Sequence, residues 1–114
     1  MLVAALVLFL IAAVGGVVMA AVRIRNEKNP PVPIAIVHGL AGATGLILLL
    51  IYVFGSGFPG LPTVSAVLFV IAAIGGFVLV SNHAKGNLIP KPLVVVHALI
   101  AVTAFVLLFI AAVA

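Results

Sequence analysis

Apolar residues run in four long stretches along the 114-residue chain, and short polar segments separate these stretches. The stretches cover about residues 2–22, 33–54, 63–81 and 92–113. Each has close to the roughly 20 residues that an α-helix needs to cross a lipid bilayer. Because backbone groups in lipid must pair within their own segment, we predict that each stretch is a transmembrane helix.

The basic residues are confined to two of the connections between these predicted helices. All five Lys and Arg residues lie in residues 23–32 and 82–91, whereas the second connection, residues 55–62, carries no charge. The positive-inside rule therefore predicts that the first and third connections are cytoplasmic and that both termini and the second connection lie outside. The first stretch has no basic start and is long enough to span, so we expect a permanent helix rather than a signal peptide.

Composition excludes several classes of function. Hydrophobic residues make up 68% of the chain and charged residues 5%, which indicates that lipid surrounds most of it. The net charge of +4 lies in short loops without interleaved aromatic residues, so a nucleic-acid partner is not expected. The absence of Cys excludes thiolate and iron–sulfur sites. The only carboxylate side chain, Glu27, lies in a loop, so no carboxylate relay runs through the membrane.

The two halves of the chain repeat each other in sequence. Residues 7–16 read VLFLIAAVGG and residues 67–76 read VLFVIAAIGG, with eight of ten positions identical. A second match joins residues 31–38, PVPIAIVH, to residues 90–97, PKPLVVVH. This pattern indicates tandem duplication of one helical hairpin.

The repeat determines the predicted architecture. Repeat 1 covers about residues 2–54 and repeat 2 about residues 63–113, within a single membrane domain of residues 1–114. Because each repeat holds two spans, the hairpins enter the bilayer in the same direction, related by a pseudo-two-fold axis along the membrane normal. We predict an all-α integral membrane protein that forms a four-helix up-and-down bundle, with equivalent residues at equal depth.

His38 and His97 are equivalent in the repeat and are the only histidines within the predicted spans. Each lies about five residues into its helix, roughly 8 Å from the cytoplasmic end. Ionisable residues at such a depth usually face the bundle interior or a functional cavity. The second and fourth helices are expected on a diagonal of about 13 Å, too far for the imidazoles to touch directly.

A haem is the cofactor that this pair of ligands fits best. A zinc site needs about four ligands, and no span offers a Cys, Asp or Glu. Two axial imidazoles are enough for a haem, and the absence of Cys leaves non-covalent haem b. Small residues beside each His and on the first and third helices are expected to leave room for the ring, and loop cations to pair with its propionates. The residues predicted to line the site with the two histidines are Gly15, Gly16, Gly42, Gly45, Gly75, Gly76, Ala101, Ala104, Arg25 and Lys85.

Other interpretations of these residues remain open. Small residues in membrane helices also serve close helix packing, and a membrane His also serves as a hydrogen-bonding group between helices. His83 aligns with Arg23 in the repeat and is expected at the membrane interface rather than as a ligand. Two alternative functions follow: a cofactor-free accessory or assembly subunit of a larger complex, and a pigment-binding protein whose histidines hold chlorophyll magnesium.

The pairs Val37-His38 and Val96-His97, each after a proline-led helix start, resemble bacterial b-type membrane cytochromes of the four-helix kind, including cytochrome b561-like proteins. The resemblance implies a location in the bacterial inner membrane and a haem held between His residues of transmembrane helices. Those families often carry two haems, whereas two span histidines provide for one. It further implies an electron carrier, or a haem-carrying subunit of a complex or homodimer, rather than a stand-alone enzyme.

Overall fold

The computed structural model describes all of residues 1–114, which form four α-helices and no strand. The helices are α1 (Leu2–Asn26), α2 (Val32–Gly55), α3 (Gly60–Ala84) and α4 (Lys91–Val113). Each contains one of the apolar stretches and extends beyond it by one to four residues at an end. Pro33 and Pro92 lie in the first turns of α2 and α4, where a missing backbone N–H breaks no hydrogen bond.

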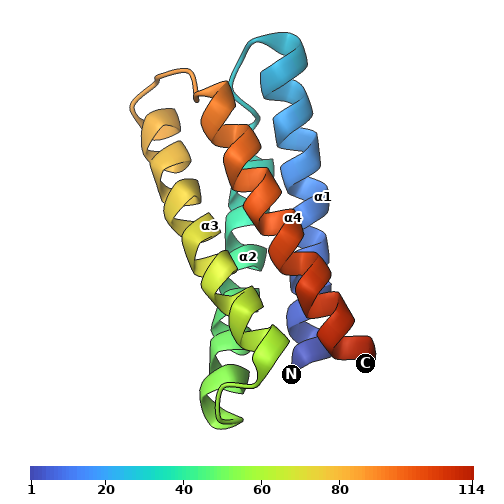
Figure 1. Cartoon of the computed structure of the whole chain (residues 1–114). Coiled ribbons are helices and arrows are strands. Elements are labelled where there is room, and N and C mark those ends of the chain that lie inside the picture. Colours follow the sequence, from blue (N-terminus) through green and yellow to red (C-terminus); the bar gives the residue numbers. More distant parts are fainter.

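The four helices run alternately up and down (Figure 1). Both termini and the turn between α2 and α3 lie at one end of the bundle, called the terminal end here, and the α1–α2 and α3–α4 loops lie at the other, called the loop end. The backbones of α1 and α2 approach each other most extensively, as do those of α3 and α4. Contacts of α1 with α4 and of α2 with α3 close the square and leave α1/α3 and α2/α4 on its diagonals.

All four helices are long enough and apolar enough to cross a membrane. They contain 23 to 25 residues, about 35 Å at 1.5 Å per residue, against a hydrocarbon core of about 30 Å. Large apolar side chains such as those of Val14, Phe77 and Val113 are exposed on the outer faces. Only 18 of the 114 residues are buried within the chain, and many large apolar side chains therefore face outward, where a bilayer would surround them.

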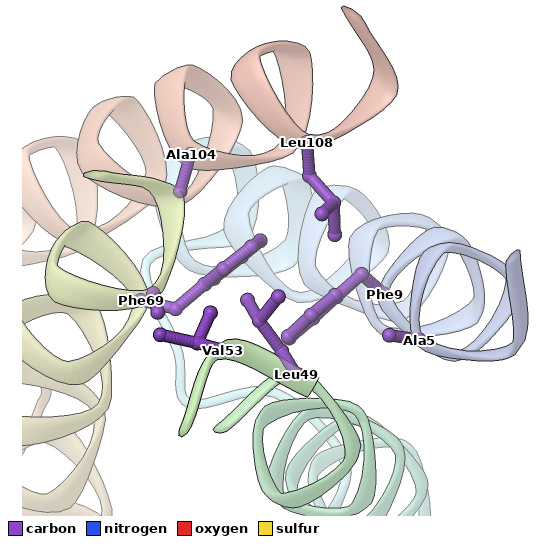
Figure 2. Close-up of a cluster of buried hydrophobic side chains, with 8 residues drawn as sticks. Ala5, Phe9, Leu49, Val53, Phe69, Ala104 and Leu108 are labelled. Carbon is purple, nitrogen blue, oxygen red and sulfur yellow. The ribbon is translucent and has the colours of Figure 1, made fainter. Parts of the chain in front are cut away.

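An apolar core fills the interior on the side of the terminal end (Figure 2). The rings of Phe9 and Phe69 stack in parallel at its centre, with centroids 3.7 Å apart and planes 3° apart. Each helix contributes two buried side chains to this cluster: Ala5 and Phe9, Leu49 and Val53, Ala66 and Phe69, and Ala104 and Leu108. The histidines are not members of it.

Candidate functional site

His38 and His97 each bond to the other helix of their own hairpin. Nδ1 of His38 lies 2.6 Å from the carbonyl oxygen of Ala12, and Nδ1 of His97 lies 2.7 Å from that of Ala72. Because a carbonyl oxygen only accepts hydrogen bonds, Nδ1–H is the donor in both cases. In the neutral ring the lone pair is then on Nε2, which has no hydrogen-bond partner in the chain and is not sealed from the surface in either residue.

The glycine pairs of α1 and α3 allow the imidazoles to lie this close to the neighbouring helix. A Cβ added at Gly16 would lie 3.1 Å from Cε1 of His38, and one at Gly76 would lie 3.3 Å from Cε1 of His97. A Cβ added at Gly15 would lie 3.5 Å from Cβ of His38, and one at Gly75 would lie 3.7 Å from Nδ1 of His97, which are ordinary contact distances. The distances of 3.1 and 3.3 Å are tighter than nearly all real Cβ contacts, so glycine at positions 16 and 76 lets each imidazole lie against the neighbouring helix.

The two imidazoles lie near each other across the hairpin boundary. Their ring centroids are 6.2 Å apart and their planes are inclined by 72°. Two imidazoles that share one metal ion through nitrogen bonds of about 2 Å have ring centres roughly 6 Å apart. Since each ring plane contains its own metal–nitrogen bond, the angle between the planes is free. The observed separation is close to that spacing. It is also shorter than the sequence suggested, since the imidazoles were expected to lie too far apart to touch.

The four small residues that follow the histidines divide into two groups. Gly45 and Ala104 are buried in the apolar core: a Cβ at Gly45 would lie 3.3 Å from ring atoms of Phe9, and the carbonyl of Ala104 accepts a hydrogen bond from Ser65 at 2.8 Å. Gly42 and Ala101, one turn after the histidines, are only partly buried. The first group thus closes the site toward the terminal end, and the second remains at its level.

The buried cation of this region is Arg23, which the sequence analysis grouped with the other loop cations and did not single out as buried. Arg23 is 6% exposed, and its Nε donates to the carbonyl oxygen of Ile89 at 2.6 Å. Arg25 and Lys85, the expected propionate partners, are exposed and make no ion pair. The signal was present in the sequence, because Arg23 follows Gly16 by seven residues and therefore shares its inward face of α1.

A polar network joins the two loops above the histidines. Nη1 of Arg23 lies 3.3 Å from Oε2 of Glu27, and Lys91 pairs with the other carboxylate oxygen. The hydrogen bond from Lys91, together with Arg23, holds the pKa of Glu27 below its usual value. The side chain of Asn29 donates a hydrogen bond to the carbonyl of Asn87 at 2.8 Å and accepts one from the backbone N–H of Ile89 at 3.0 Å. The network connects the two hairpins at the loop end.

The donor set fits a haem better than a bare ion. No group of three or more His, Cys, Asp or Glu side chains lies close enough together to hold a metal ion by itself. A haem needs only two axial ligands from the protein, and the Nε2 atoms of His38 and His97, which have no partner in the chain, would be the atoms to hold it. In each ring the other nitrogen, Nδ1, donates to a backbone carbonyl, an arrangement that is also common in histidines that bind metals.

Comparison of the chain with protein-family models, curated proteins and solved structures found no significant match.

Proposed function

We propose that this chain is an integral membrane protein built from two tandem hairpins, with its loop end on the cytoplasmic side. The four apolar helices support membrane insertion. The distribution of charge supports the orientation, because all five Lys and Arg residues gather at the loop end and the turn between α2 and α3 has none.

We further propose that the protein binds one haem b, with His38 and His97 as axial ligands. The observation that carries this proposal is the matched pair of Nδ1–H bonds to Ala12 and Ala72, on two rings whose centroids are 6.2 Å apart. These bonds fix the tautomer and the orientation of both ligands, which metal-binding histidines require. Gly16 and Gly76 leave room for that orientation.

The surroundings favour one function for the bound group. Haem iron with two strong axial ligands has no open position for oxygen and exchanges single electrons. Phe9 and Phe69 lie about one helical turn before Ala12 and Ala72, and their stacked rings close the site toward the terminal end. We therefore propose electron transfer by a small membrane cytochrome, or by a haem-carrying subunit of a larger complex.

The test is an optical spectrum of the full chain, purified in detergent after expression with added haem precursor. A bis-histidine haem b gives a red protein whose Soret band shifts on reduction by dithionite. His38→Ala and His97→Ala should each abolish the low-spin spectrum, whereas the matched control His83→Ala should retain it. Circular dichroism of each variant shows whether the helices remain formed.

Three results would contradict the proposal. A colourless protein that also fails to take up added haemin would favour the cofactor-free packing subunit. A chlorophyll-type spectrum would favour the pigment-binding alternative. Retention of the low-spin haem spectrum in both His38→Ala and His97→Ala would show that other residues hold the haem.

A further inference from the structure

An apolar groove runs along the outer face of the α1–α2 hairpin. Its volume is about 560 Å³, and Val14 and Gly15 of α1 and Pro33, Ile34 and Val37 of α2 form most of its walls. Val14 and Val37 are more than half exposed there. In a bilayer this face meets lipid, so the groove is open to an acyl chain from the side.

Two cations, Arg25 and Lys28, lie between the groove-lining segments of α1 and α2, on the side of the loop end. Arg25 follows Val14 by eleven residues, which places both on one face of α1, with Arg25 about 16 Å further along the axis. Lys28 lies in the loop that leads from α1 to Pro33. Both side chains are exposed and neither makes an ion pair.

The one carboxylate side chain of the protein does not neutralise these cations. Glu27 forms ion pairs with Arg23 and Lys91 in the network between the loops. The positive charges of Arg25 and Lys28 are therefore not compensated, and they lie on the loop side of the apolar groove. This combination matches an amphiphile with an anionic head and a hydrocarbon tail.

Two other parts of the molecule lack the combination and provide comparisons. A second groove near the terminal end, beside Leu50, Phe54 and Val67, is also apolar but lies next to a turn without charge. In the α3–α4 hairpin, Lys85 matches Arg25 but Leu88 stands where Lys28 does in the repeat.

We propose that the α1–α2 hairpin binds one anionic phospholipid, with its phosphate at Arg25 and Lys28 and one acyl chain in the groove beside Val14 and Val37. The proposal requires the helices to lie in a bilayer but does not depend on haem. The lipid head would then sit beside the first loop and its chain along the wall behind His38, since Gly15 separates groove and histidine.

The experiment uses the full chain in mild detergent, titrated with phosphatidylglycerol or with phosphatidylcholine of the same chains, and native mass spectrometry to count bound lipids. The wild type should retain one phosphatidylglycerol in preference to phosphatidylcholine. Arg25→Gln with Lys28→Gln should weaken phosphatidylglycerol binding about 30-fold, since each surface cation contributes roughly fivefold. Val14→Phe should also weaken binding, because the larger side chain fills the groove.

Lys85→Gln is the matched control and should leave the affinity unchanged. The melting temperature of each variant in detergent shows that it remains folded. Equal binding of both lipids, equal losses from Lys85→Gln and from the double variant, or full binding by Val14→Phe would overturn the proposal. Displacement of the lipid by glycerol phosphate or inorganic phosphate at similar concentration would overturn the role of the acyl chain.

Discussion

The two ends of the bundle are built from different kinds of contact. Toward the terminal end, the stacked Phe9 and Phe69 and their apolar neighbours fill the interior. Toward the loop end, the groups that lie inward are His38, His97 and Arg23. The two histidines bond to backbone carbonyls of neighbouring helices, and Arg23 bonds to the carbonyl of Ile89 in the α3–α4 loop. Because lipid is as apolar as a side-chain core, packing at the terminal end gains shape complementarity but little hydrophobic free energy. Polar groups cost more in lipid and are found inside where they have partners and a role.

Phe9→Ala should have the largest effect on stability, because it removes one ring of the stack and leaves a cavity against Phe69 and Gly45. We expect the free energy of unfolding to fall by about 2–3 kcal/mol, somewhat below values for water-soluble cores. Titration of detergent micelles with dodecyl sulfate measures it. Phe77→Ala is the matched control, since Phe77 is 74% exposed, and it should change the free energy little. Equal losses from the two variants would show that the stack contributes nothing specific.

Arg23→Met tests whether the loop end depends on its buried cation. The variant keeps a long side chain but leaves the buried Ile89 carbonyl without its donor, and it removes one partner of Glu27. A hydrogen bond to a charged group contributes about 2 kcal/mol, so a loss of that size is expected in the same titration. Arg25→Gln removes an equal charge from an exposed, unpaired site and should change stability by under about 0.5 kcal/mol. Similar losses from both would mean that total charge, rather than the Ile89 bond, is responsible.

Much of this architecture could be predicted from the sequence, because long apolar stretches and helix-start prolines are local signals. The four helices and their alternating directions are confirmed. The partners of His38 and His97 could not be predicted in the same way, since a hydrogen bond to a neighbouring helix depends on rotation and axial offset of both helices. Sequence reasoning expected Gly15, Gly16, Gly75 and Gly76 to face a cofactor, whereas the imidazoles themselves lie on them.

The cations show a second limit of sequence reasoning. Positive charge in a loop predicts topology, but it does not distinguish a side chain that turns inward from one that faces water. Arg23 could have been selected from its position two turns after Gly16, whereas Arg25, two residues later, points to a different face of α1. The expected roles of Arg25 and Lys85 at haem propionates remain predictions.

Gly16→Ala should lower stability less than the two preceding variants, and its effect should be confined to the region around His38. The added methyl group would lie 3.1 Å from Cε1 of His38, so the ring must shift against its bond to Ala12. We expect a loss of about 1 kcal/mol in stability and weaker haemin binding in an optical titration. Gly39→Ala is the control, because nothing lies within 4 Å of its added Cβ and the better helix former should be neutral or slightly stabilising. Unchanged haemin binding in Gly16→Ala would show that Gly16 is not needed for the haem-binding site.

Glu27 gives the smallest expected effect, a dependence of stability on pH at the loop end. Its pKa is lowered from 4.5, first by the hydrogen bond from Lys91 and then by Arg23. A carboxyl group with a lowered pKa in the folded state stabilises that state above pH 4.5, and this contribution disappears as the pH falls below 4.5 through the folded pKa. Because the carboxylate is exposed to solvent, salt should weaken the dependence further.

Glu27→Gln isolates this dependence, since Glu27 is the only carboxylate side chain in the protein. Unfolding midpoints of the wild type should decline as the pH falls from about 5.5 to 3, and those of the variant should decline less over that range. The terminal carboxyl of Ala114 also titrates in acid, but it lies at the terminal end, and an amidated C-terminus provides its control. A decline of equal size in Glu27→Gln, removed by amidation, would assign the acid sensitivity to the terminal end. The ion pairs of Glu27 would then add nothing measurable to stability, and the bonds of Arg23 and Asn29 would be left as the polar links between the hairpins at the loop end.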